Sequence, residues 1–251
     1  MASTIFLILT ILLSSRTLEG TSRGDTFEVS ATEKHEQWMA RFQRVYSDES
    51  EKRNSFDVFK KNLEFVERFN MNKNKPYKLD VNDFSDLTDD EFRATHTGLV
   101  VPKGIIGSST SESDKMMPFR YGNVSDAGES MDWRQQGAVT PVSGYETVPM
   151  NNEEALLRAV SQQPVSVGIE GIGDAFRHYS GGIFDGECGT DLHHAVTIVG
   201  YGVSEEGTKY WVVKNSWGQT WGEGGYMRIK RDVGAPEGMC GLAILGFYPL
   251  A

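Results

Sequence analysis

The chain has 251 residues, of which 39% are hydrophobic and 24% are charged, and its formal net charge is -10 at pH 7. This composition is typical of a globular protein and not of a disordered or fibrous one, and the length allows one large domain or two modest ones. The acidic balance argues against nucleic acid as a partner, because a nucleic-acid-binding surface needs clustered Lys and Arg.

The amino end carries an apolar run from Ile5 to Leu13. A run of this length suits the core of a secretion signal and is shorter than the roughly 20 residues needed to span a bilayer. We therefore expect a cleaved signal peptide over residues 1–24, no transmembrane segment, and entry into the secretory pathway. The alternative is a buried helix or strand at the start of the domain.

Three helices are predicted in the amino half. The first, over residues 32–46, and the second, after Ser47 and Asp48, carry apolar residues at helical spacing, which predicts that they cross and share an apolar seam. The residues of this seam are Trp38, Met39, Phe42, Tyr46, Phe56, Phe59, Leu63 and Val66. A capping box from Thr88 to Glu91 predicts a short third helix through Phe92.

Residues 97–126 show no helix or strand period and are rich in Gly, Ser and Pro, which indicates a linker or an extended segment. Within this stretch, Asn123 begins a glycosylation sequon. Beyond it, Asn151 and Asn152 cap a predicted helix that ends before Pro164. Strands are then predicted over residues 165–169, 195–201, 210–214 and 226–230, which together favour an antiparallel sheet or barrel.

The chain has two cysteines, Cys188 and Cys240. In an oxidising secretory route, such a pair suits one disulfide. A metal site formed by both cysteines with His193 and His194 is the alternative, although its spacing fits no standard zinc pattern.

Residues 51–70 resemble the interrupted helix motif of papain-family propeptides, in which the matching residues are Glu51, Phe59, Asn62, Val66 and Asn70. Ser55 stands where the family has arginine, so we expect an ion pair of the helical module to be lost. Asn82, Phe84 and Asp86 resemble the second propeptide motif, with Asp80 at a position where a small residue is usual.

The carboxyl half resembles the mature enzyme of plant members of the same family. Residues 131–134 and 137–142 match its start, and residues 186–190, 194–196, 200–202 and 214–218 match the segments that bear the catalytic histidine and asparagine. The resemblance implies that His194 and Asn215 are catalytic, that Trp217 shields their hydrogen bond, and that Cys188 pairs with Cys240.

These residue types suit thiol chemistry. An imidazole lowers the pKa of a nearby thiol and later protonates the leaving amine, and an amide side chain orients the imidazole. Without the surrounding motifs, the spacing alone favours interpreting His194 as a satisfied buried histidine, and Asn215 and Trp217 as turn and core residues. His193 lies on the opposite side of the strand and is expected to have no catalytic role.

The expected nucleophile is missing. After Val142 the family continues through an oxyanion glutamine to a cysteine on a long helix, and neither is present in this chain. Family histidines lie roughly 130 to 150 residues after that cysteine, whereas His194 follows Val142 by about 50 residues, so about 80 to 90 residues are absent. Ser143, near the junction, lacks the helix terminus and oxyanion donor that would make it reactive.

The resemblance thus implies an α+β protein, in which a helical propeptide module precedes the β-barrel half of the papain fold, with the helical half largely missing. The expected parts are residues 25–100 as the propeptide inhibitor domain, 101–128 as a linker or activation segment, and 129–251 as an incomplete peptidase domain.

Three functions remain open for this chain. The first is a papain-family zymogen homologue that is inactive as a peptidase. The resemblance implies that its intact parent cleaves protein or peptide substrates by acyl transfer, without a cofactor or metal. The second is an inhibitor or regulator that binds related cysteine proteases through the propeptide. The third is a non-catalytic secreted binding module.

Overall fold

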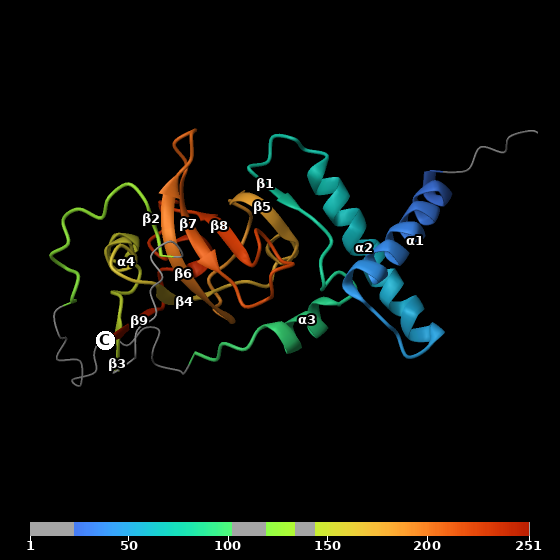
Figure 1. Cartoon of the computed structure of the whole chain (residues 1–251), viewed down its shortest axis with the longest axis horizontal. Helices are drawn as coiled ribbons and strands as arrows, with labels where there is room; N and C mark the ends of the chain where they lie inside the picture. The colour runs from blue at the N-terminus through green and yellow to red at the C-terminus, as the bar shows by residue number, and fades with distance from the viewer. Residues whose placement is uncertain (1–22, 102–118, 134–143, 251) are drawn as a thin grey trace, which may run out of the picture.

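The computed structural model describes residues 23–101, 119–133 and 144–250. Residues 1–22 of the predicted signal peptide, Ser143 and most of the predicted linker lie outside these residues. Helices α1 (Arg23–Phe42) and α2 (Glu49–Asn70) cross at one end of the molecule, and strand β1 (Tyr77–Leu79) and helix α3 (Asp89–His96) connect them to the strand-rich part (Figure 1).

Local signals set where the helices begin. The Asp48 side chain caps α2 by accepting hydrogen bonds from the amides of Ser50 and Glu51, and Thr88 forms the predicted capping box with Glu91 at the start of α3. The first helix ends at Phe42, four residues sooner than predicted, because Gln43 takes a φ of 54°, which a right-handed helix does not allow.

The predicted apolar seam between α1 and α2 is confirmed, except that Val66 belongs to the main core and Tyr46 lies outside the cluster. Ala31 and Trp38 of α1 pack against Phe59 and Leu63 of α2. The Trp38 indole also donates a hydrogen bond of 2.8 Å to the carbonyl of Asn82, so the loop after β1 is attached to the same small core.

The carboxyl part is a sheet with short helices. Its elements are β2 (Met131–Asp132), β3 (Gly144–Thr147), α4 (Glu153–Val160), β4 (Val165–Ile169), α5 (Asp174–Arg177), β5 (Tyr179–Phe184), β6 (His194–Val203), β7 (Lys209–Lys214), β8 (Tyr226–Lys230), the 3-10 turn η1 (Met239–Gly241) and β9 (Gly246–Leu250). The strand order is β1-β5-β8-β7-β6-β4-β9-β3, and β2 pairs with β6.

All four predicted strands and the helix capped by Asn152 are confirmed. Two expectations need correction. The amino half is not purely helical, because β1 pairs with β5 and so joins the sheet of the carboxyl part. The sheet is also not wholly antiparallel, because β5 and β8 run parallel.

A glycine makes the junction of β1 and β5 possible. Gly182 of β5 has a φ of 93°, and a Cβ atom there would lie 2.2 Å from the carbonyl oxygen of Pro76. Only glycine therefore allows the two strands to approach so closely.

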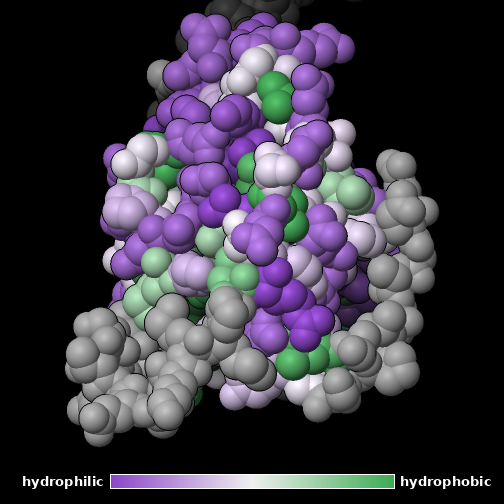
Figure 2. All heavy atoms as spheres, turned by 90° about the vertical axis from the view of Figure 1, so that its left-hand side faces the viewer, coloured by the Kyte–Doolittle hydropathy of each residue, from purple (hydrophilic) through white to green (hydrophobic). Residues whose placement is uncertain are grey.

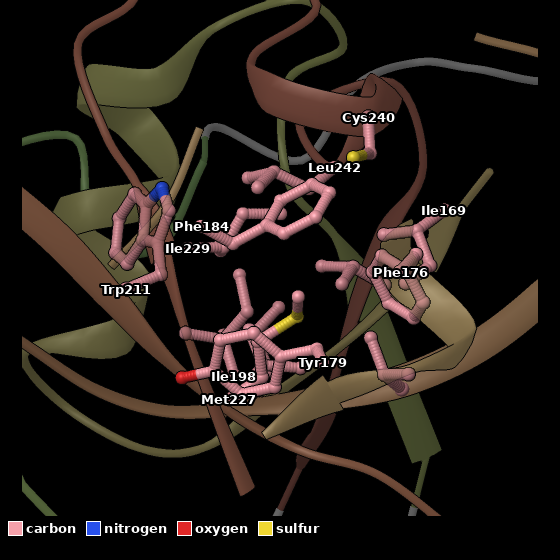
Figure 3. Close-up of a cluster of buried hydrophobic side chains, with 14 of the residues drawn as sticks. Ile169, Phe176, Tyr179, Phe184, Ile198, Trp211, Met227, Ile229, Cys240 and Leu242 are labelled. Atoms are coloured by element: carbon pink, nitrogen blue, oxygen red, sulfur yellow. The ribbon is translucent and has the colours of Figure 1, made fainter. Parts of the chain in front are cut away.

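Aromatic and branched side chains fill the core between the strands. Figure 3 shows how they converge from several elements: Ile169, Phe176, Tyr179, Phe184, Ile198, Trp211, Met227, Ile229, Cys240 and Leu242. The end of the molecule that carries β3 and β9 is different. There the described residues in view are mostly hydrophilic, with hydrophobic residues in small separate groups (Figure 2).

Candidate active site

The sheet brings His194 and Asn215 together. His194 begins β6 and Asn215 directly follows β7, and because these neighbouring strands are antiparallel, both residues lie at the same edge. The Nε2 atom of His194 lies 2.8 Å from Oδ1 of Asn215. An amide oxygen only accepts, so Nε2 carries the proton, and in the neutral ring Nδ1 is the basic nitrogen.

Trp217 covers this hydrogen bond on one side. Its ring stacks on the imidazole of His194 with centroids 4.7 Å apart and an interplanar angle of 25°. Trp221 meets Trp217 edge-on at 5.1 Å. His194 and Asn215 are both buried, so this pair, called the dyad below, lies in apolar surroundings that exclude water.

Burial lowers the pKa of His194, and the nearby His96 lowers it further, while the hydrogen bond to Asn215 raises it. The net direction is downward, because desolvation of the charged ring is the largest of these causes. The ring is therefore neutral at neutral pH, which is the form that acts as a base.

The amino module lies over the dyad. The amides of Gly98 and Leu99 donate hydrogen bonds of 3.1 and 2.9 Å to the carbonyl of His193. The indole of Trp217 donates one of 3.0 Å to the carbonyl of His96. The segment that follows α3 is thus fixed across the site, and His194 is only 5% exposed.

Cys188 and Cys240 form a disulfide, with Cα atoms 5.1 Å apart. Neither sulfur atom is therefore a thiolate ligand, and among the described residues no group of three or more His, Cys, Asp and Glu side chains is placed to hold a metal ion. His193, the other residue of that alternative, pairs instead with Asp191 at 3.2 Å.

The residues of the two propeptide motifs connect the parts of the amino module. Asn62 of α2 donates to the carbonyl of Ser85 at 2.9 Å. Asn70 both donates to the carbonyl of Leu79 and accepts from its amide, at 2.7 and 3.1 Å. Of the remaining members, Glu51 accepts from Ser47, Phe59 and Val66 are buried, and Phe84 packs edge-on against Trp217.

We expected an ion pair of the helical module to be lost at Ser55. The module contains another ion pair, formed by Arg44. Arg44 lies between α1 and α2 and pairs with the buried carboxylate of Asp86 through both Nε and Nη2, at 2.8 and 2.5 Å. Tyr46 donates a further hydrogen bond to the same carboxylate at 3.0 Å. Asp86 is thus charge-compensated without an arginine at position 55.

Two residues of this region were missed by sequence reasoning. His96 ends α3 above the dyad, and Arg177 lies buried where α2 and α3 meet the carboxyl part. Neither belongs to a periodic pattern or to a motif, although a charged residue within the apolar surroundings of Phe176 was a weak signal for Arg177.

Comparison with known proteins agrees with this arrangement. Residues 105–250 match the papain family cysteine proteases, and residues 35–92 match the cathepsin propeptide inhibitor domain. The chain is 37% identical to a senescence-specific cysteine protease, SAG12, of Arabidopsis thaliana, over 88% of the chain and 91% of that protein. It is 31% identical to fruit bromelain of Ananas comosus, over 85% of each.

Solved structures show the same fold. The proform of Amb a 11, a cysteine protease and ragweed pollen allergen, superposes with a TM-score of 0.79 at 27% identity, covering 89% of this chain and 86% of that one. A recombinant stem bromelain precursor superposes with a TM-score of 0.73 at 29% identity, covering 88% and 98%. The chain therefore belongs to the papain family of cysteine proteases and is a homologue of their zymogens, with a propeptide inhibitor domain ahead of the peptidase part.

Proposed function

We propose that this chain is a papain-family zymogen homologue that cannot act as a cysteine peptidase, because it lacks the nucleophile. The observation that carries the proposal is the state of its sulfur atoms. The chain has two cysteines, and both are joined in the disulfide. A disulfide sulfur cannot form the thiolate that attacks a peptide carbonyl.

A missing internal segment accounts for this loss. The alignment with the Arabidopsis protease runs over 317 positions, more than the 251 residues of the chain, so it contains long gaps. In the described residues from 119 to 133 and from 144 to 250, the longest helix is α4, with 8 residues. Both observations favour loss of the helical half, with residues 129–251 keeping mainly the β-barrel half and residues 25–100 the propeptide domain.

The remaining dyad keeps the geometry that a thiol would need. Nε2 of His194 is held by Asn215, and Nδ1 has no hydrogen-bond partner among the described residues. In an intact parent, Nδ1 would take the proton of the cysteine and return it to the leaving amine during acyl transfer from a protein substrate. Here the same nitrogen has no thiol to activate.

A peptidase assay tests the proposal. The purified chain, treated with acid to release the propeptide, is incubated with a general peptide substrate and with a thiol-directed active-site probe, beside an intact relative. We expect neither turnover nor labelling, whereas the relative should show both. Turnover accompanied by labelling of Cys188 or Cys240 would show that one of them has become a nucleophile and would refute the proposal.

A second function, regulation of related cysteine proteases by the propeptide, is supported by the contacts that Asn62, Asn70 and Asp86 make within the module. Inhibition of an intact relative by the purified chain would support it. A lack of inhibition at micromolar concentration would exclude it.

We also propose that the chain follows the secretory route to the exterior or to a vacuole. The disulfide is typical of oxidising compartments, and Asn123 is exposed, as a glycosylation site must be. Within the described part of the chain, no helix is both long enough and apolar enough to cross a membrane.

A further inference from the structure

A buried arginine lies where the amino module meets the peptidase part. Arg177 is the last residue of α5 and only 1% exposed. Burying a guanidinium group costs several kcal/mol unless it is paired. Docking of the module on the peptidase part therefore depends on the groups that pair with Arg177.

Most of the partners of this guanidinium come from the module. Its Nη1 atom lies 3.1 Å from Oδ1 of Asp89, the first residue of α3. Its Nη2 atom donates to Asn62 of α2 at 3.4 Å. Its central carbon lies 5.3 Å from the ring centroid of Phe92, which is a cation–π distance.

The peptidase part supplies less. From its own side, Nη2 of Arg177 donates to Asp174 at 2.9 Å, and the side chains of Asp174 and Asp89 are both partly exposed, at 45% and 69%. The Nε and Nη1 atoms are both buried and have no hydrogen-bond partner among the described residues, so Nη1 meets Asp89 at ion-pair distance only. Asp89 is therefore the second carboxylate at ion-pair distance from this guanidinium, and it is the one that the module supplies.

The backbone of Arg177 fixes the side chain in this place. Its carbonyl accepts hydrogen bonds from the side-chain amide of Asn82 at 2.8 Å and from the indole of Trp221 at 2.9 Å. One residue thus joins α2, the loop after β1 and α3 to the wall of the candidate active site.

We infer that Asn62, Asp89 and Phe92 form an arginine receptor on the module, and that this receptor selects as its docking partner a peptidase domain with a buried arginine at the end of the helix before β5. In this chain the partner is its own carboxyl part. The inference holds whether or not the chain is catalytically silent, because it concerns only docking.

The reactivity of His194 reports docking in the full-length chain, because the segment that covers it follows α3 directly. Modification by diethyl pyrocarbonate is followed at His194 by peptide mass spectrometry. Asp89→Arg replaces the carboxylate that lies 3.1 Å from Nη1 with a second cation, and we expect it to raise the modification rate about two- to fivefold, the factor that loss of a partly exposed ion pair gives. Asp90→Arg is the matched control, because it adds the same charge one residue away, and it should leave the rate unchanged.

A charge swap completes the test. Asp89→Arg combined with Arg177→Glu should return the rate to that of the unmodified chain. Equal rates for Asp89→Arg and Asp90→Arg would overturn the inference, and so would a combined variant as fast as Asp89→Arg alone. If Arg177→Glu abolishes cooperative melting, Arg177→Lys replaces it. Lysine keeps the positive charge but lacks the two terminal nitrogen atoms of the guanidinium group. A faster modification of His194 in Arg177→Lys would therefore support the inference, and an unchanged rate would overturn it.

Discussion

Reduction of the Cys188–Cys240 disulfide should lower the free energy of unfolding by about 4 kcal/mol. The two cysteines are 52 residues apart, and closing a loop of that length removes about 14 cal/mol/K of chain entropy from the unfolded state. Cys240 lies in the main core at 3% exposure, and reduction replaces no side chain, so it tests the covalent link without a substitution.

The measurement is equilibrium unfolding in urea, with and without reductant at every urea concentration. We expect a lower midpoint in reductant, with the difference in extrapolated free energy close to the loop value. The control is the double variant Cys188→Ala and Cys240→Ala, which should be insensitive to reductant. If reduction leaves the unfolding curve of the unmodified chain in place, the loop argument fails and the disulfide does not stabilise this fold.

Three further predictions concern titration and the amino module. Asn215→Ala removes the hydrogen bond that raises the pKa of His194, so an NMR titration of the ring should show a lower pKa, and a higher one would contradict the assigned dyad. Asp86→Asn replaces a buried charged partner of Arg44 with a neutral one and should cost about 1.5 to 3 kcal/mol in urea unfolding, whereas an unchanged midpoint would mean that the pair adds nothing. His178 is buried beside Arg177, and burial lowers its pKa to about 3. The folded ring stays neutral while the unfolded one protonates near its ordinary value, so stability is retained above about pH 6.5 and falls by up to about 1.4 kcal/mol per pH unit below it. His178→Phe should show a shallower loss than the unmodified chain, and parallel curves would contradict the prediction.

Local signals explain why the helices could be predicted from the sequence. The caps at Asp48, Thr88 and Asn152 lie next to the residues that they satisfy, so a short stretch of sequence contains all of the necessary information. Strand β1 was missed for the opposite reason. It has three residues and is defined by its pairing with β5, which lies about 100 residues away. Glycines in β5 make that segment a poor match to the composition of a strand, so neither partner was predicted.

In the candidate active site, too, some contacts could be predicted from the sequence and others could not. His194 and Asn215 stand in short motifs at the ends of two paired strands, so their meeting could be predicted. The contact between Arg177 and Asn62 joins residues 115 positions apart, and no pattern in either segment points to the other. The compensation of Asp86 by Arg44 was missed because Arg44 lies outside both motifs and is 42 positions away from Asp86 in the sequence.

The pairing of β1 with β5 has a consequence for proteolytic processing. Strand β1 occupies one border of the sheet, and beneath it β5 would present free backbone amide and carbonyl groups if the amino module left. Such an uncovered border is a template on which another chain can add a strand. In this protein the amino module therefore also covers a strand edge on which another chain could add, and a chain trimmed of residues 23–101 is expected to self-associate more readily than the full-length chain.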